Sequence, residues 1–374
     1  MKINQIEVYQ VDLPYINGTY KLSGGRTYDG FDATLVKITT DTGLDGWGES
    51  TPFGTNYIAA HAKGVRSGIE EIAPYILGMD PCHIDRINNV MDECLEGHLH
   101  AKTPIDVACW DLLGKSTKRS VSELLGGPIK GPVPVISSIY AGSPDDMKER
   151  VEQHRQKGFL GHSVKIGADE KEGGPSLDAE RIKACLKDRK PGEWFLVDAN
   201  GGLSVEHALR MLSLLPDEIE FVLEAPCRTW LETQSLRKKT NIPIFLDELA
   251  QTEEDVLRSI KDEIADGIGI KISKQGGLTR SKKIRDICMA GGLVTSIQET
   301  VGSEVAFAAL LQLAQSTPRH ILRCALDTRS MVRKSTAKFD VPIKNGGAEV
   351  PYEKFGLGIE IIEENIGDPV QIYK

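Results

Sequence analysis

The sequence predicts an α/β fold, a TIM-like (β/α)₈ barrel with an N-terminal α+β capping domain that the C-terminal segment completes. Eight short apolar runs follow one another between residues 131 and 329, each about one βα unit from the next. So many successive βα units favour a closed barrel over an open sheet. Residues 1–130 show no such repeat. The length of 374 residues suits a barrel of roughly 250 residues with a smaller domain beside it.

Residues 1–130 are predicted to form the capping domain. Alternating apolar and polar residues at 2–13 and 31–40 are typical of antiparallel strands, and a turn at 43–48 leads into a short third strand. Strands followed by helices in this order indicate an α+β domain. The helical patterns lie at 58–77, 84–96 and 103–117.

Residues 131–329 are predicted to form the barrel. The interiors of the apolar runs are rich in Val, Ile, Leu and Phe, as buried parallel strands require. The helix after the first run has Ser143 as its expected N-cap and Pro144 at its first position. The remaining segment, 330–374, has a strand-like stretch at 359–362 and is expected to return to the capping domain. The runs begin at Val133, His162, Trp194, Phe221, Ile242, Gly267, Leu293 and His320.

Composition and charge exclude several classes of partner. The net charge of −9 and the absence of a basic stripe argue against binding to nucleic acid or to an anionic membrane. Seven cysteines without a C-x-x-C pair favour reduced thiols over a disulfide framework or a zinc knuckle. The N-terminus alternates like a strand, and no apolar run is long enough to span a membrane. We therefore expect a cytoplasmic protein, a homo-oligomer, whose ligand is a small molecule.

Three consecutive barrel strands, the third to the fifth, end in an acid: Asp198, Glu224 and Asp247. The C-terminal ends of barrel strands form the rim on which active sites lie. Three neighbouring carboxylates would repel one another unless a cation lay between them, and an all-oxygen ligand set suits Mg²⁺. The alternative is that each acid caps the helix that follows it. Three acids in register on adjacent strands favour the metal.

Two lysines lie within strand patterns, Lys165 in the second strand and Lys271 in the sixth. A lysine in a buried strand is costly unless it is paired or functional. These strands face each other across an eight-membered ring, with the acids on the arc between them. A desolvated lysine near other cations is expected to have a lowered pKa and to act as a base. The alternative is a lysine that extends out at a strand end, and Lys274, nearer the loop, is the weaker candidate.

Together these residues resemble the enolase superfamily, and within it the muconate-lactonizing-enzyme subgroup, over nearly the whole chain. The resemblance implies an α-proton abstraction from a carboxylate substrate, with a lysine base and the Mg²⁺ cofactor known for this superfamily. One lysine would remove the proton, and the other would return it to the opposite face or assist a leaving group. The matching motifs are Asp198-Ala-Asn200, Leu223-Glu224-Ala-Pro226, Leu246-Asp247-Glu248, and Lys271 in Ile270-Lys-Ile-Ser-Lys-Gln-Gly-Gly277, together with Lys165.

Two departures from the subgroup narrow the expected substrate. The usual Lys-x-Lys of the second strand has Ser163 in its first position. Dipeptide epimerases that look like this chain carry Asp-x-Asp on the eighth strand, whereas only Asp327 is present here, where it could meet a substrate amine. Loops 15–28 and 51–57, with glycines and tyrosines, are expected either to close over the barrel mouth or to be plain surface turns. The predicted substrate contacts are Tyr20, Tyr57, Ser163, Asn200, Glu299 and Asp327.

In the two loops, Ser163 and Asp327, the chain resembles the proline-derivative branch of the superfamily. This branch contains the cis-3-hydroxy-L-proline dehydratases and the epimerases of proline betaines. The expected reaction is dehydration or 2-epimerisation, or both, of a hydroxyproline, with the amino acid as the small-molecule partner. Alternatives are a proline betaine epimerase, a cycloisomerase or another racemase of the superfamily. An acid-sugar dehydratase would normally offer a His-Asp pair on strands six and seven, which is missing here. A non-catalytic ligand-binding barrel is the alternative of another class, and the intact set of acids and lysines speaks against it.

Other motifs are expected to have no catalytic role. Gly114-Lys115-Ser116 lies inside a helical pattern, without the first glycine of a phosphate-binding loop. His98-x-His100 lacks partner ligands and is expected to be a solvated loop pair, and a structural role is expected for His162. Because side chains alternate along a strand, only one of Gln298 and Glu299 is expected to point inward.

Overall fold

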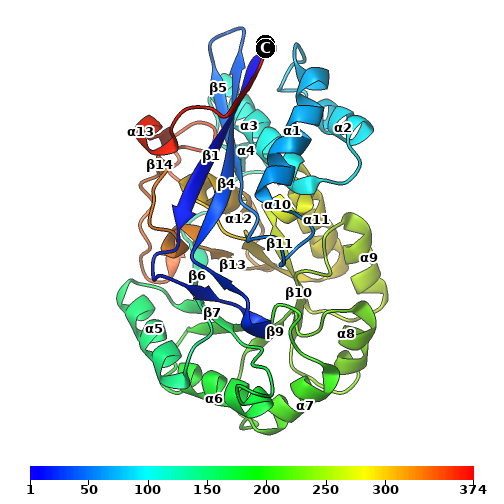
Figure 1. The fold of residues 1–374 in the computed structure, drawn as a ribbon, viewed down its shortest axis with the longest axis vertical. Coiled ribbons are helices and arrows are strands. Elements are labelled where there is room, and N and C mark those ends of the chain that lie inside the picture. Colours follow the sequence, from blue (N-terminus) through cyan, green and yellow to red (C-terminus); the bar gives the residue numbers. More distant parts are fainter.

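The computed structural model describes residues 1–374 and confirms the barrel with its capping domain (Figure 1). Eight parallel strands pair in chain order, and the last pairs back with the first, which closes the ring. The strands are β6 (Val133–Ile139), β7 (Gly161–Lys165), β8 (Trp194–Asp198), β9 (Val222–Glu224), β10 (Ile244–Leu246), β11 (Gly267–Lys271), β12 (Val294–Gln298) and β13 (Leu322–Leu326).

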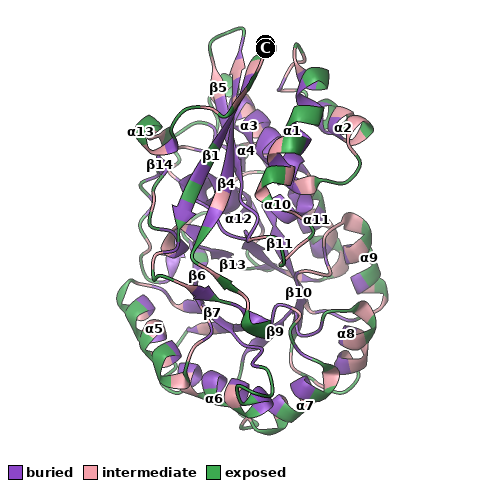
Figure 2. Cartoon of the chain, viewed as in Figure 1, coloured by how far each residue is buried: buried purple, intermediate pink, exposed green.

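Helices surround the barrel; most have a buried side and an exposed side, whereas the helix at residues 304–315 is buried throughout (Figure 2). Most begin with a serine or threonine whose side chain accepts a backbone N–H; in α5, Ser143 Oγ accepts from Asp146 N at 3.2 Å and Pro144 follows as the first residue. The helices are α5 (Pro144–Gln156), α6 (Gly174–Leu186), α7 (Val205–Ser213), α8 (Trp230–Arg237), α9 (Glu253–Lys261), the short α10 (Ile272–Gln275), α11 (Leu278–Gly291) and α12 (Glu304–Gln315).

The capping domain combines an antiparallel sheet with helices on one side of the barrel (Figure 1). Its sheet has the order β17 (Gln371–Tyr373), β1 (Ile3–Pro14), β4 (Gly30–Thr40) and β5 (Asp45–Ser50). Two short strands, β2 (Tyr20–Lys21) and β3 (Thr27–Tyr28), form a separate hairpin around a single helical turn, η1 (Ser23–Gly25). The helices are α1 (Ala62–Ile76), α2 (Ile84–Cys94), α3 (Leu99–Thr117) and α4 (Val121–Leu124).

The C-terminal segment differs from its prediction in one detail. The stretch at 359–362 contains β16 (Glu360–Ile361), which pairs with β14 (Ala337–Lys338) inside the same segment. It is β17, further along, that joins β1 of the capping sheet, and β15 (Gly347–Ala348) pairs with β6 at the barrel. The turn η2 (Thr328–Met331) leads from the barrel into this segment, which also contains α13 (Glu363–Ile366). Domain boundaries at 130 and 329 stay a prediction.

Two buried acids of the capping domain cap barrel helices. Glu49, in β5, accepts hydrogen bonds from Ser303 N at 2.9 Å and Ala306 N at 3.2 Å, at the start of α12. Asp106, in α3, accepts from Thr279 N at 3.1 Å, at the start of α11. Burial raises the pKa of both acids. These bonds satisfy N–H groups that a helix start leaves free, and they fix the cap on the barrel.

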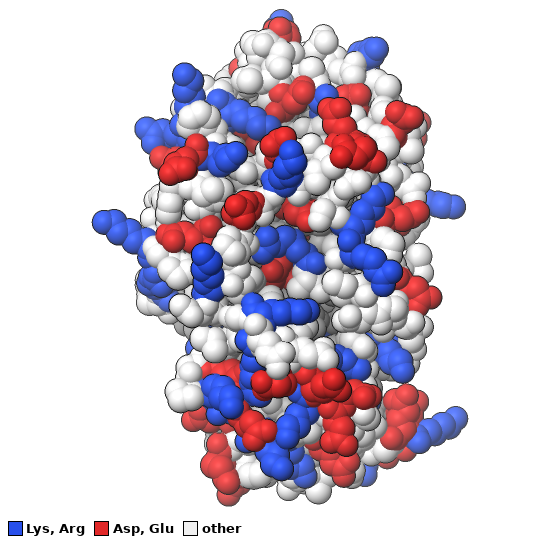
Figure 3. Space-filling view, turned by 90° about the vertical axis from the view of Figure 1, so that its left-hand side faces the viewer, with Lys and Arg blue, Asp and Glu red and all other residues white.

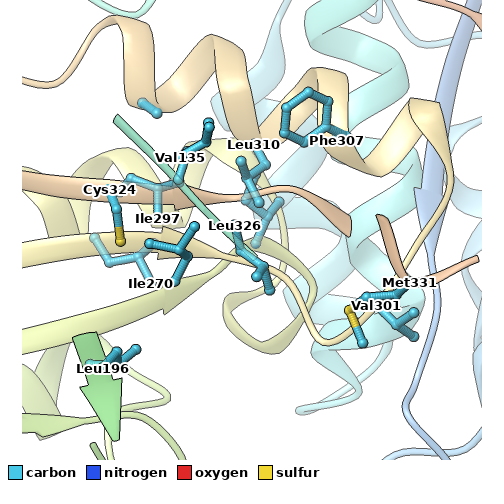
Figure 4. Packing of buried hydrophobic residues seen from close by; sticks show 14 of the residues in the cluster. Val135, Leu196, Ile270, Ile297, Val301, Phe307, Leu310, Cys324, Leu326 and Met331 are labelled. Carbon is cyan, nitrogen blue, oxygen red and sulfur yellow. The ribbon is translucent and has the colours of Figure 1, made fainter. Parts of the chain in front are cut away.

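A continuous apolar core joins the two parts. One cluster of 76 buried residues includes strand residues of the cap as well as the barrel, so the two parts are packed together rather than tethered. Figure 4 shows Val135, Ile270 and Ile297 of the barrel strands packed near Leu310 and Phe307 of α12. A second cluster of 18 residues lies between the cap sheet and α1 to α3.

The surface carries charges of both signs, and the cysteines form no disulfides. Figure 3 shows acidic and basic side chains interspersed on the face drawn. All seven cysteines are free thiols. None of the helices combines the length and the apolar character that crossing a membrane would need.

Stability should fall as the pH drops below about 6.5, in part because of His154 on α5. Burial, followed by the positive charge of Lys157, lowers the pKa of His154 from 6.5 to about 3. Between these values the unfolded chain binds a proton that the folded chain does not, so acid favours unfolding. His154→Phe should therefore flatten the fall of the melting temperature between pH 6.5 and 4. Phe159→Leu, which alters the same ring contact without an ionisable group, should lower the melting temperature similarly at every pH; an unchanged slope in His154→Phe would contradict the assignment.

Candidate active site

The predicted acids and lysines meet at the C-terminal rim of the barrel. Lys165, Asp198 and Glu224 lie in one register row across β7, β8 and β9, so their side chains point to the same face. Asp247 directly follows β10, and Lys271 ends β11. All five side chains are buried.

Each lysine of the rim lies against a carboxylate. Lys165 Nζ donates to Asp198, and Lys271 Nζ donates to Asp247. Lys274, the weaker sequence candidate, is also buried and donates to Asp247 Oδ1 at 2.8 Å and to its backbone oxygen at 2.6 Å. Burial lowers the pKa of Lys165, but Asp198, Tyr20 and Glu224 together outweigh it and raise the pKa above its usual value. Burial also lowers the pKa of Lys271, and Asp247 and Glu248 together outweigh it. The expected lowering of the lysine pKa values was therefore wrong, because the carboxylates dominate the site.

Excess negative charge gathers around Glu224. Burial, and then the charges of Asp198 and Asp247, raise the pKa of Glu224 well above its usual range. Burial and the same two acids raise the pKa of Glu248 to about 7. Asn200, in the left-handed region at φ 46°, donates from its side chain to Asp198 Oδ2 at 3.0 Å and to Glu248 Oε1 at 3.1 Å. Carboxylates held this closely are stable only with added positive charge.

The residues at this point fit a hard divalent cation. Three buried oxygens have no hydrogen-bond partner: Glu224 Oε2, Glu248 Oε2 and Asn200 Oδ1. Such oxygens are the donors that Mg²⁺ prefers. No three acidic, histidine or cysteine side chains converge into a ready-made metal cage, and the ammonium groups of Lys165 and Lys271 lie on two of the acids instead.

A small cavity of about 20 Å³ lies beside these residues and is covered by the capping domain. We call it the active-site cavity. Tyr57 Oη donates to Asp247 at 3.0 Å and accepts from Lys271 at 2.6 Å, and Tyr20 Oη shares a hydrogen bond of 2.7 Å with Ser138. Both tyrosine rings pack edge-on against Phe53. The cavity is lined by Tyr20, Leu22, Phe53, Tyr57, Ser138, Ser163, Lys165, Asn200, Lys271, Gln298, Glu299, Thr300, Leu326 and Met331.

Asp327 is the predicted contact that does not line this cavity. Both of its carboxylate oxygens accept from Arg329 at 3.0 Å, in the turn η2 that follows β13. A role in binding a substrate amine is therefore not supported for Asp327. Glu299 is the acid that does line the cavity; it accepts from Ser273 N at 2.6 Å and Thr300 N at 2.9 Å. Burial raises the pKa of Glu299 to about 7.

Sequence reasoning missed Gln298 and Glu248. Gln298 donates to Glu224 Oε1 at 2.6 Å, and it lines the cavity together with Glu299. The expectation that only one of the two would point inward was wrong because β12 ends at Gln298, beyond which strand alternation no longer applies. The signal for Glu248 was its position directly after Asp247.

The two histidine assignments have different outcomes. His162 shares hydrogen bonds of 3.0 Å with Ser137 and Glu193, away from the active-site cavity, as its structural role requires. His98 is exposed as predicted, whereas His100 is buried and shares a hydrogen bond of 3.0 Å with Ser50. The prediction of a solvated pair was therefore correct for His98 and wrong for His100. The reason is that α3 begins between the two residues and buries His100.

Comparison with known proteins agrees with this geometry. Residues 21–126 match the mandelate racemase/muconate lactonizing enzyme N-terminal domain, and residues 146–365 match the enolase C-terminal domain-like family. The chain is 38% identical to a cis-3-hydroxy-L-proline dehydratase of Roseibium aggregatum, over 100% of both chains. It is 29% identical to an N-succinyl-L-Arg/Lys racemase of Bacillus cereus, over 98% of this chain and 97% of the relative. A mandelate racemase/muconate lactonizing enzyme-type structure from Roseovarius nubinhibens ISM, in complex with magnesium, superposes with a TM-score of 0.98 at 55% identity over 100% of both chains.

Proposed function

The chain belongs to the mandelate racemase/muconate lactonizing enzyme family of the enolase superfamily, and from this we propose that it removes the α-proton of an amino-acid carboxylate, with dehydration of cis-3-hydroxy-L-proline as its main reaction. One observation carries the proposal: Lys165 and Lys271, from opposite strands of the ring, line the same small cavity beside buried carboxylates. The 38% identity to a dehydratase of this substrate supports the choice of substrate.

Asp198, Glu224 and Asp247 are the proposed Mg²⁺ ligands. Their oxygen donors, the unpartnered Glu224 Oε2 and the crowding of negative charge support this assignment, as does the related structure in complex with magnesium. When bound, Mg²⁺ would offset the second negative charge that a substrate carboxylate gains as it becomes an enediolate.

The two lysines divide the proton transfers between them. Because β7 and β11 lie four strands apart in the ring, Lys165 and Lys271 reach a bound substrate from opposite faces. One lysine takes the proton from the α-carbon in its neutral form, which requires a bound cation, and not that lysine, to offset the charge of Asp198 or Asp247. The electrons of the broken C–H bond pass to the enediolate. The other, protonated, gives its proton to the departing 3-hydroxyl as the C3–O bond breaks and water leaves. The resulting enamine takes up a proton at C3 and releases one from its nitrogen, which gives a cyclic imine.

The remaining cavity residues favour a small cyclic amino acid. At about 20 Å³ the closed cavity has room for little more than one water molecule, so the covering loops must open for any substrate. Once they open, the aromatic walls formed by Tyr20, Phe53 and Tyr57 suit a ring of proline size better than a dipeptide. We assign the substrate amine to Glu299, whose carboxylate is the one negative group among the lining residues.

A 2-epimerase is the second candidate. Lysines on both faces of the substrate also permit a proton to be returned to the opposite side of the α-carbon, and one relative of this chain is a racemase. A proline betaine would present a quaternary ammonium group, which aromatic faces such as those of Tyr20 and Tyr57 can contact without hydrogen bonding.

A substrate screen in D₂O separates these reactions. Proline, the 3- and 4-hydroxyproline isomers and proline betaine are incubated with the enzyme and Mg²⁺ and followed by NMR. We expect cis-3-hydroxy-L-proline to disappear with formation of a cyclic imine. Deuterium at C2 without loss of water would indicate epimerisation instead. Turnover of N-succinyl amino acids or dipeptides, with every proline derivative inert, would refute the proposed substrate class.

A further inference from the structure

A second cavity, of about 450 Å³, lies on the other face of the segment that covers the active site. We call it the rear cavity. Phe53 and Tyr57 line the active-site cavity, whereas Thr55 and Ile58, from the same segment, line the rear cavity. Residues 51–61 therefore form a wall between two spaces.

The starts of two long helices meet at the rear cavity. Residues of the first turns of α1 and α3 line it, and both helices exceed ten residues. The N-cap of α3 is His98, at φ 44°, and its side chain makes no capping hydrogen bond. The Ala101 N–H donates to the His98 backbone oxygen at 2.8 Å, which leaves the N–H groups of Leu99 and His100 without a partner at the positive end of the helix dipole. Helix starts of this kind bind anions.

The unpartnered side chain of His100 is a second, independent indication that the rear cavity binds a ligand. It lines the rear cavity and is only 6% exposed. Its Nδ1 is engaged by Ser50, which does not line the cavity, and its Nε2, on the opposite edge of the ring, has no partner. Burial and then the charge of Lys274 lower the pKa of His100 to about 3, so the ring is neutral. If Ser50 donates to Nδ1, the ring proton lies on Nε2, where no group of the protein accepts it.

The charge of the lining is also one-sided. None of the 14 lining residues is acidic, although the whole chain carries a net charge of −9. His61, the N-cap of α1, accepts from Gly64 N through Nδ1 at 3.2 Å, which leaves a donor on its Nε2 when the ring is neutral. Lys274 lines the cavity too, but its ammonium group already donates to Asp247, so it adds little free charge.

We propose that the rear cavity binds a small oxyanion, a carboxylate or phosphate group, and that the bound anion holds residues 51–61 closed. The anion would accept from the backbone N–H groups of Leu99 and His100 and from Nε2 of His100 and His61. Because Thr55 and Ile58 form the wall, an occupant fixes the segment whose Tyr57 reaches Asp247 and Lys271 on the other side.

Calorimetric titration of the Mg²⁺-loaded protein with inorganic phosphate, and separately with acetate, tests the site. Ala59, exposed on the wall, offers a matched pair: Ala59→Glu places a negative charge at the cavity, and Ala59→Gln places a neutral group of the same shape. We expect saturable binding to the unchanged protein and to Ala59→Gln, and binding about tenfold weaker to Ala59→Glu. His100→Phe should also weaken binding, because it removes the donor and keeps the ring volume. Tighter binding of phosphate or of acetate tells which group the site prefers.

Hydrogen exchange of residues 51–61 tests the effect on the segment. Exchange should slow when the anion binds to the unchanged protein and to Ala59→Gln. No saturable binding of either anion, or equal binding to Ala59→Glu and Ala59→Gln, would overturn the site. Saturable binding that leaves exchange of 51–61 unchanged would overturn its role in closing the segment.

Discussion

Replacing Lys165 or Lys271 by alanine should lower α-proton exchange by about 10²- to 10⁴-fold, the usual contribution of a positioned acid or base. These are the two ammonium groups that line the active-site cavity, and each approaches from its own side of the ring. Each variant should lose exchange mainly with one enantiomer of the substrate, and the two should lose opposite ones. The measurement is deuterium incorporation at the α-carbon in D₂O, followed by NMR for both enantiomers.

The control for this experiment is Lys238→Ala, which replaces an exposed lysine outside the cavity. This variant should catalyse α-proton exchange at the full rate. Circular dichroism should show the same fold in all variants. Exchange that survives the double replacement of Lys165 and Lys271 would rule out both lysines as the proton carriers, and loss of the same enantiomer in both single variants would rule out the division by face.

Asp247→Asn should abolish Mg²⁺-dependent turnover while the fold remains. Burial opposes ionisation of Asp247, but Lys271 and Lys274 outweigh it and hold the pKa of this carboxyl below its usual range, so the group is fully charged. Asparagine keeps the shape and removes the charge. Affinity for Mg²⁺, measured by calorimetry on the EDTA-treated protein, should fall by more than the roughly 10- to 100-fold that loss of a ligand's hydrogen-bond partner causes.

The matching control is Asp217→Asn, on the surface, which should bind Mg²⁺ as the unchanged protein does. EDTA should stop turnover of the unchanged enzyme, and added Mg²⁺ should restore it. Full Mg²⁺-dependent activity in Asp247→Asn would show that the metal lies elsewhere.

The sequence predicted the barrel and its rim well because both depend on local pattern. Apolar runs of strand length mark buried parallel strands, and the residue at the end of each run is placed on the rim by the geometry of the ring. Asp198, Glu224 and Asp247 were found in this way, and the structure brings them to one edge. The metal assignment itself stays a prediction.

What the sequence did not reveal depends on contacts made after the strands end. Asp327 lies at the rim, as its position suggested, but the turn η2 brings Arg329 against it, and a strand pattern contains no information about that turn. The lysine pKa values have the same origin: their direction depends on how closely each carboxylate approaches, and position along a strand gives no such distance. The loop contact of Tyr57 with Lys271 was anticipated only as a contact to substrate.

The helix capping by Glu49 and Asp106 makes the barrel helices dependent on the capping domain. Each acid of the capping domain provides a hydrogen-bond acceptor for a free N–H group at the start of a barrel helix. A hybrid enzyme that joins this barrel to the capping domain of a relative would need an acid at the start of α11 and another at the start of α12. Without them, two buried helix starts would be left without acceptors. New substrate preferences are therefore more easily obtained by changing residues in the 15–28 and 51–57 loops than by exchanging the whole capping domain.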